Sequence, residues 1–182
     1  MKFDPNGWLS GVRRIASPNY DARPVHTQVS LLVIHSISLP PDEFGGPGIR
    51  RLFTNMLDCS AHPYYAQLQG LRVSAHFLIG RDGSITQFVP CGSRAWHAGV
   101  SVWQGRERCN DFSIGIELEG CDTMPFEPAQ YMALSRLTRR LQRRYPIRHI
   151  AGHAEIAPGR KTDPGPTFDW EHYFSLLGRS SA

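Results

Sequence analysis

The sequence predicts an α/β fold in which a mixed central β-sheet is flanked by helices. Residues 31–34, Leu-Leu-Val-Ile, are a continuous apolar run, which is typical of a strand buried on both faces. Asp82-Gly83 separates two strand-like stretches, 73–79 and 84–89, and this arrangement is a strong signal for a β-hairpin. Strands interspersed with a long helix near the C-terminal end favour a mixed sheet covered by helices over an all-α or all-β layout.

The N-terminal third combines an irregular start with the first buried strand. Residues 1–27 are rich in Pro, Gly, Asn and Arg and are expected to form an irregular lead-in, with Trp8 and Tyr20 as its anchors. The apolar strand that follows ends at His35. The next segment, SISLPPDEFGGPGI, is dense in Pro and Gly and predicts a loop. A helix is expected from Ile49 to about Leu57.

Residues 112–119 predict a strand with an apolar face and a polar face. The alternation places Phe112, Ile114, Ile116 and Leu118 on one side and Ser113, Gly115, Glu117 and Glu119 on the other. The polar side combines small residues with two carboxylates, so it has room for a ligand.

The C-terminal third predicts two helices around a last strand. Residues 128–145 have Pro at the first turn and leucines at helical spacing, and Pro146 ends that helix. Residues 147–151 predict a short strand, and residues 154–168 a long Pro- and Gly-rich loop. Residues 169–177 predict a closing helix, with Asp169 as its N-cap.

The composition is that of one ordinary globular domain over residues 1–182. The 182 residues are 41% hydrophobic and 20% charged, which suits a single core. The polar residues 178–182 are expected to be a flexible tail. The net charge is +4, with much of the excess between Arg136 and Arg148. That run leaves a nucleic-acid binder as one alternative, but we interpret it as a solvated helix face and expect no nucleic-acid partner.

The sequence indicates a cytoplasmic protein. The longest apolar run, residues 31–34, is far too short to span a membrane, and the N-terminus lacks the apolar segment of a secretory signal. No CxxC pair supports a zinc ribbon, and reduced thiols suit the cytosol; the cysteines are Cys59, Cys91, Cys109 and Cys121. We expect no membrane partner and a monomer.

Two histidines and a carboxylate are candidates for a zinc site. His35 ends a buried strand, and His153 follows the last strand in the same way. Asp163 stands in a loop too rich in Pro and Gly to be core. Two imidazoles with a carboxylate are a common catalytic zinc set that leaves a fourth position for water. By spacing alone the zinc interpretation is weak, because a lone histidine is more often a structural, hydrogen-bonded residue.

Glu117 and Lys161 are candidates for acid–base and electrostatic roles. A metal-activated water needs a base within reach, and Glu117 has small neighbours on its strand face. Lys161 and Asp163 are two residues apart in an extended loop, so their side chains leave on the same side. The alternatives are that Glu117 and Glu119 face solvent and that Lys161 is a solvated surface residue.

Seven segments together resemble a known family. The segments are VIHSISLPP, AHPYY, LRVSAHFLI, RDGSITQFVP, RAWHAGVS, QGRERCNDFSIGIELEG and IAPGRKTDPGP. In this order they are similar to the AmpD-type 1,6-anhydro-N-acetylmuramoyl-L-alanine amidases, whose fold is shared with peptidoglycan recognition proteins. The similarity runs from about Gly7 to Trp170. It implies a zinc amidase that cuts the bond between N-acetylmuramic acid and L-alanine in muropeptides, in cytoplasmic peptidoglycan recycling.

The resemblance also implies roles for individual residues. His35, His153 and Asp163 match the zinc ligands, while Glu117 and Lys161 match the catalytic residues. The positions matching substrate contacts are Arg72, Arg108, Ser36, Trp96 and Trp103. Both arginines match positions that meet stem-peptide carboxylates, for which the planar guanidinium is suited. A core role is an open alternative for Trp96.

Departures from the family pattern, and alternatives to it, are also visible. Ser36 stands where Asn is usual, and Gly48 where Trp can occur; Ala154 and Gly159 also differ.

His76 and His97 lie inside matched segments, and we interpret both as framework or groove residues rather than ligands. The alternatives to the amidase are a non-catalytic muropeptide-binding module and a broader amidase acting on intact peptidoglycan.

Overall fold

The computed structural model describes residues 2–178, and most of the predicted flexible tail, residues 179–182, lies outside them. Its centre is a six-stranded sheet in the order β1-β5-β4-β9-β3-β10. The β4–β5 pair is antiparallel, and the other neighbours in this sheet are parallel. The strands are β1 (Arg13–Arg14), β3 (Leu31–Ile37), β4 (Phe77–Ile79), β5 (Ile85–Gln87), β9 (Ser113–Glu119) and β10 (His149–Gly152). The predicted mixed sheet is confirmed.

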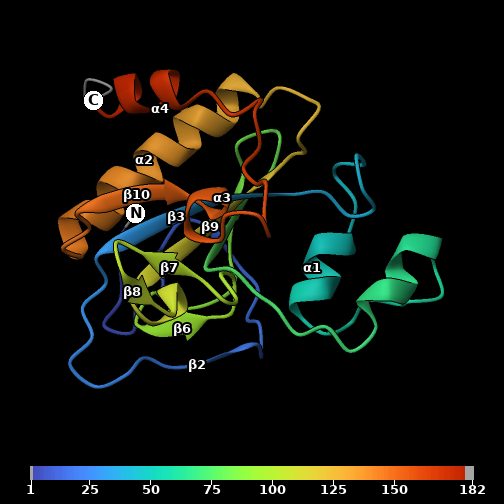
Figure 1. Cartoon of the computed structure of the whole chain (residues 1–182), viewed down its shortest axis with the longest axis horizontal. Helices are drawn as coiled ribbons and strands as arrows, with labels where there is room; N and C mark the ends of the chain where they lie inside the picture. The colour runs from blue at the N-terminus through green and yellow to red at the C-terminus, as the bar shows by residue number, and fades with distance from the viewer. Residues whose placement is uncertain (1, 179–182) are drawn as a thin grey trace.

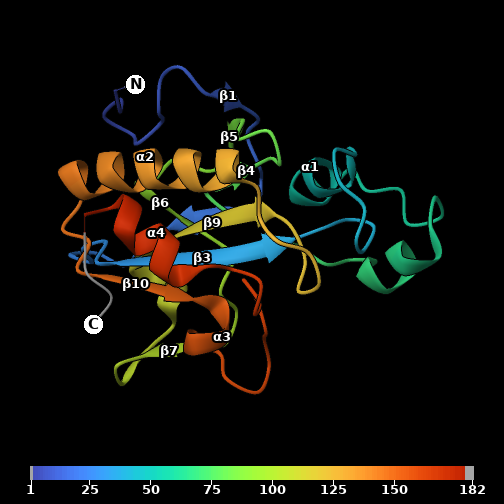
Figure 2. The same ribbon diagram turned by 90° about the horizontal axis from the view of Figure 1, so that it is seen from above.

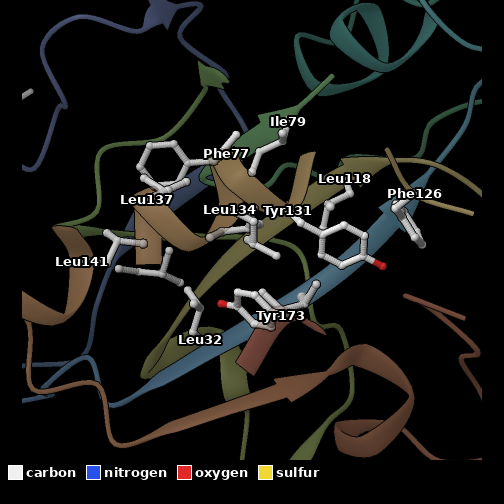
Figure 3. Packing of buried hydrophobic residues seen from close by; sticks show 14 of the residues in the cluster. Leu32, Phe77, Ile79, Leu118, Phe126, Tyr131, Leu134, Leu137, Leu141 and Tyr173 are labelled. Atoms are coloured by element: carbon white, nitrogen blue, oxygen red, sulfur yellow. The ribbon is translucent and has the colours of Figure 1, made fainter. Parts of the chain in front are cut away.

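Two helices cover one face of this sheet. Figure 2 shows α2 (Pro128–Arg144) and α4 (Trp170–Leu176) on the same side of β3 and β9. Leu134, Leu137 and Leu141 of α2 pack against Leu32 and Ile79 of the strands (Figure 3). Such fully buried side chains each contribute roughly 1.5–3 kcal/mol through the hydrophobic effect. The predicted Asp169 cap is present, since its Oδ1 accepts a hydrogen bond from the backbone N–H of His172 at 2.8 Å.

The other face has a smaller core beneath short strands and a one-turn helix. Leu31, Val33 and Phe112 pack there with Ile156 of α3 (His153–Ile156), a turn that interrupts the predicted loop 154–168. Two-stranded sheets complete this side: β2 (Tyr20–Ala22) with β6 (Ser93–Ala95), and β7 (Val102–Trp103) with β8 (Arg106–Glu107). A short 3₁₀ turn, η2 (Cys109–Asp111), precedes β9.

Two short helices extend beyond the carboxyl end of β3. Figures 1 and 2 both show α1 (Gly48–Phe53) there, with the 3₁₀ helix η1 (Pro63–Leu68) farther from the sheet. The predicted extension of α1 to Leu57 is wrong. Asn55 adopts a left-handed φ of 58°, and the Met56 N–H donates to the Arg51 carbonyl, which together terminate the helix.

The N-terminal lead-in is more regular than expected. It contributes β1 to the central sheet and β2 to a smaller one. Leu9 is its buried anchor at 5% exposed, whereas Tyr20 is 41% exposed, so the expected role of Tyr20 is wrong. Tyr20 belongs to a short strand paired on one side only, with β6, which leaves its ring in solvent.

Candidate active site

The candidate site lies where β3, β9 and β10 end. Leu32 and Ile34 point to the α2 side of the sheet, so His35 points to the opposite face, because side chains alternate along a strand. Glu117 is the register partner of His35 on β9 and leaves the sheet on the same face. β10 runs parallel to β3, with Gly152 paired to Ile34, so His153 follows directly beside the site.

Three atoms that could each donate an electron pair to a metal ion lie close together at this point. His35 Nδ1 lies 3.0 Å from His153 Nδ1 and 3.1 Å from Asp163 Oδ2, and His153 Nδ1 lies 3.0 Å from the same oxygen. Both histidines are buried, and Asp163 is 15% exposed. The Asp163 carbonyl accepts from the Ala154 N–H at 2.8 Å, which ties the loop that carries Asp163 to α3.

Burial and mutual contact shift the pKa values of these groups. Burial lowers the pKa of His35 to about 4, so this ring is neutral and able to donate an electron pair at neutral pH. Burial opposes ionisation of Asp163, but the hydrogen bonds to His153 and His35 hold the pKa of that carboxyl well below its usual value. The resulting set is a carboxylate beside two imidazoles, which is a suitable ligand set for a divalent metal.

Glu117 is a buried carboxyl group with an unsatisfied oxygen. The residue is 8% exposed, and its Oε2 has no hydrogen-bond partner among the described residues. Burial and the nearby Asp163 raise its pKa well above the usual value, while the charge of Lys161 opposes that shift. Leaving a buried carboxyl oxygen unpaired is costly, and this oxygen is available to a group bound in the adjoining cavity. The alternative that Glu117 faces solvent is wrong.

Glu119 has a different, structural environment. It is 7% exposed, so the solvent-facing alternative is wrong for this residue too. Its Oε1 accepts from the Gly45 N–H at 2.6 Å and its Oε2 from the Arg81 N–H at 3.3 Å. Glu119 therefore ties the loop before α1 to the β4–β5 hairpin.

A cavity of about 520 Å³ opens onto these groups. Of the predicted substrate-contacting residues, Ser36 and Trp96 line it together with Glu117, Lys161 and Asp163. Its far wall is largely apolar and comes from α1, η1 and the segment after η1, with Leu52, Phe53, Tyr64, Leu68, Leu71 and Val73. The cavity can therefore accept a ligand with a polar reacting group and an adjacent less polar part.

The other three predicted contact residues do not line this cavity. Arg72 is exposed. Arg108 is 70% exposed, and its Nε lies 3.3 Å from Asp111 Oδ2. Trp103 lines a separate cavity of about 510 Å³ with Arg106 and His149. Substrate binding by these three residues stays a prediction.

Gly48, one of the departures from the family pattern, is closely packed. A Cβ atom at this position would lie 2.3 Å from the Leu39 carbonyl oxygen and 2.9 Å from the Tyr65 hydroxyl. Any larger residue therefore requires the backbone of the loop to move.

His97 and Asn110 also lie at the site, and sequence spacing did not indicate their contacts there. His97 Nδ1 lies 2.9 Å from His35 Nε2, although the residues are 62 positions apart. Asn110 Oδ1 accepts from the backbone N–H groups of His97 and Ala98. The only sequence signal was that both residues lie inside matched segments. His76 hydrogen-bonds to the backbone of Ser93 and Gly115, as expected of a framework residue.

The donor set fits a metal ion. Ligand bonds of about 2.0–2.1 Å in tetrahedral geometry place ligand atoms about 3.3 Å apart, close to the observed separations of 3.0 to 3.1 Å. The orphaned Glu117 oxygen lies on the same face of the sheet, where a metal-activated water would need a base. The fold and this set of groups together suit a metal-dependent hydrolase.

Comparison with known proteins identifies the family. Residues 25–166 match the N-acetylmuramoyl-L-alanine amidase family. The 1,6-anhydro-N-acetylmuramyl-L-alanine amidase AmpD of Citrobacter freundii is 59% identical over 177 residues, covering 96% of this chain and 95% of that protein. The chain therefore belongs to the N-acetylmuramoyl-L-alanine amidase family and is an amidase of the AmpD type.

Solved structures agree with this assignment. A crystal structure of a selenomethionine derivative of AmpD superposes with a TM-score of 0.94 at 59% identity, covering 97% of this chain and 99% of that one. The amidase AmiD from Escherichia coli, solved with anhydro-N-acetylmuramic acid-L-Ala-D-γ-Glu-L-Lys, has a TM-score of 0.63 at 32% identity, covering 98% of this chain and 66% of that one. Across the described residues, every helix is too short or too polar to cross a membrane.

Proposed function

We propose that this amidase uses zinc to hydrolyse the amide between 1,6-anhydro-N-acetylmuramic acid and L-alanine in muropeptides, during cytoplasmic peptidoglycan recycling. The observation that carries the proposal is the orphaned, buried carboxyl group of Glu117 beside the converging atoms of His35, His153 and Asp163. The names of the similar AmpD proteins support the anhydro sugar. The four free cysteines are consistent with a reducing compartment.

Different residues of the site have different roles in the proposed reaction. Bound by His35, His153 and Asp163, Zn²⁺ would supply a Lewis acid that acidifies water and polarises the scissile carbonyl. Glu117 takes the proton of the attacking water, and its raised pKa then suits it to return that proton to the leaving L-alanine nitrogen. Lys161 lines the same cavity, where its ammonium group stabilises the negative charge that develops on the carbonyl oxygen.

The cavity can accept the sugar of a muropeptide. Its wall at Trp96 can stack against a sugar, because an aromatic face packs well on an apolar sugar face. The rival functions are a broader amidase on intact peptidoglycan and a non-catalytic muropeptide binder. The second rival is disfavoured because a complete donor set and a base are both present.

Metal analysis and two substrates test the proposal. The purified protein should contain one zinc per chain and should cleave an anhydromuropeptide much faster than intact peptidoglycan. Comparable rates on the two substrates would instead support the broader amidase. Binding without cleavage by the zinc-loaded protein would support the non-catalytic module.

A further inference from the structure

We propose that His97 and the backbone carbonyl of Ala98 form one shared support that orients both histidine ligands, with His97 as a positioning residue. The inference rests on the proposed zinc site. Two adjacent residues thus contact the two ligands at the ring nitrogens that face away from the donor cluster.

The hydrogen bonds determine which nitrogen of each ligand carries a proton. His35 and His153 both present Nδ1 to the donor cluster, and a metal requires those nitrogens to be unprotonated. The proton of each neutral ring is then on Nε2. His35 Nε2 lies 2.9 Å from His97 Nδ1, and His153 Nε2 lies 3.2 Å from the Ala98 carbonyl oxygen. Each Nε2–H therefore has an acceptor in the same segment.

The orientation of His97 is determined by its own surroundings. If Nδ1 accepts from His35, the proton of the His97 ring is on Nε2, which lies 3.1 Å from Ser113 Oγ. The ring packs over Gly115, where a Cβ atom would lie only 2.5 Å from the His97 Cγ. The missing side chain at Gly115 thus creates the space that this ring fills.

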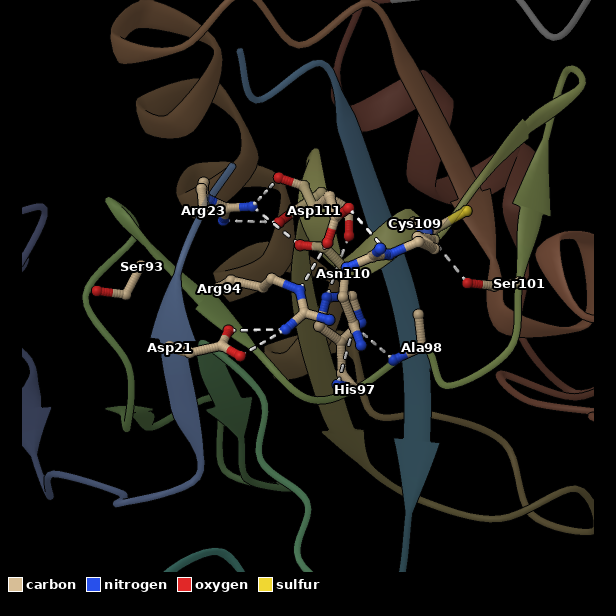
Figure 4. Close-up of polar contacts among 12 residues, drawn as sticks. Asp21, Arg23, Ser93, Arg94, His97, Ala98, Ser101, Cys109, Asn110 and Asp111 are labelled. Atoms are coloured by element: carbon tan, nitrogen blue, oxygen red, sulfur yellow. Dashed lines mark hydrogen bonds and ion pairs between the residues drawn. The ribbon is translucent and has the colours of Figure 1, made fainter. Parts of the chain in front are cut away.

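The supporting segment is fastened by Asn110. Its Oδ1 accepts from the His97 N–H at 3.1 Å and from the Ala98 N–H at 2.8 Å (Figure 4). Arg160 adds a hydrogen bond to the Ala98 carbonyl at 2.7 Å. The neighbouring Asp111 is paired with Arg94 at 2.6 Å. Because one buried side chain binds both backbone N–H groups, the His97–Ala98 segment cannot easily rotate its peptide planes. Such a rotation would break the contact to His35 or the contact to His153.

The consequence is a metal site ordered before metal arrives. Partners of this kind hold a ligand ring in the correct tautomer and orientation, and losing one costs about 10- to 100-fold in metal affinity. The same donor atoms on freely rotating rings would bind with a larger loss of conformational entropy.

A pair of variants of equal size separates this role from simple packing. His97→Asn places an amide oxygen close to the position of Nδ1, whereas His97→Leu has nearly the same shape and no acceptor. Zinc affinity, measured by competition with a chelator, should fall about 10- to 100-fold for His97→Leu and only a few-fold for His97→Asn. His172→Leu is the control: it removes a histidine on an exposed position of α4 whose ring lies against Tyr131, and it should keep the wild-type zinc affinity.

The tautomers can also be observed in the unmutated protein. In ¹⁵N spectra of the zinc-loaded enzyme, His35 should carry its proton on Nε2 and show a coupling across the hydrogen bond to His97 Nδ1. The inference is overturned if His35 Nε2 is unprotonated, or if His97→Leu and His97→Asn bind zinc equally. A wild-type protein that binds no zinc would instead overturn the proposed function, so the two failures are distinguishable.

Discussion

Glu117 lies beside His35 as its register partner on the neighbouring parallel strand, and both side chains leave the same face of the sheet. The pairing places a buried carboxyl group of raised pKa next to a neutral imidazole. Strand pairing of this kind is rigid, so the proposed base and the proposed metal ligand hold a constant separation without help from a loop. Catalytic groups on regular elements are more precisely positioned than groups on loops.

Replacing Glu117 by Gln should abolish most activity and leave zinc binding intact. The amide keeps the size of the carboxyl group but cannot accept the water proton, so we expect kcat to fall about 10²- to 10⁴-fold. Steady-state kinetics with metal analysis of the same preparation measure both effects. Glu171→Gln, on an exposed position of α4, is the control. Normal turnover by zinc-loaded Glu117→Gln would show that another group is the base.

Asp163→Ala and Asp169→Ala should differ sharply, although the positions are six residues apart. Removing Asp163 leaves two neutral imidazoles, so zinc affinity and activity should be lost together. Asp169 caps α4, so its loss should cost about 1 kcal/mol of stability and leave zinc content unchanged. Metal analysis, activity with added zinc and thermal unfolding of both variants are the measurements. Tight zinc binding by Asp163→Ala would remove Asp163 from the ligand set.

Arg72→Ala and Arg108→Ala should raise KM more than they lower kcat. Both side chains are exposed, so each is accessible to a carboxylate of a stem peptide. Loss of a hydrogen bond between charged groups is expected to weaken binding by about 10- to 100-fold. The effect should vanish on a substrate that lacks the distal stem residues, and Arg143→Ala on the exposed side of α2 should be silent. Equal losses on full and shortened substrates would contradict this assignment.

The metal-free protein should lose stability as the pH falls below about 6.5, in part because of His76. Burial lowers the pKa of His76 from 6.5 to about 3, so the unfolded chain binds a proton that the folded chain rejects. The contribution of His76 to the free energy of unfolding is fully present above the pKa of the unfolded state. It is lost between about pH 6.5 and about pH 3, at about 1.4 kcal/mol per pH unit. Urea unfolding of wild type and His76→Gln at several pH values should show a shallower slope for the variant. Parallel slopes would show that His76 is not the titrating group.

Much of the fold followed from local sequence patterns, whereas the candidate ligand set came from the family resemblance. The apolar run before His35 indicated the buried strand β3, and Asp82-Gly83 indicated the β4–β5 hairpin, because side-chain periodicity and turn chemistry depend on neighbouring residues. Long motifs around Glu117 and Asp163 identified the family, which the comparisons confirm. Boundaries were less predictable, as the early end of α1 at Asn55 shows, since a few backbone hydrogen bonds determine where a helix stops.

Tertiary structure alone decided how these groups are surrounded. Spacing could not show that Glu119 ties two loops together while Glu117, two residues earlier on the same face, has an orphaned oxygen. Nor could it show that His97 contacts His35, or that Asn110 holds the His97–Ala98 segment. Those contacts join residues far apart in the chain, and the space left by Gly115 on β9 is what admits the His97 ring. Periodicity determines which face of a strand a residue occupies, whereas packing between distant segments determines what it meets there.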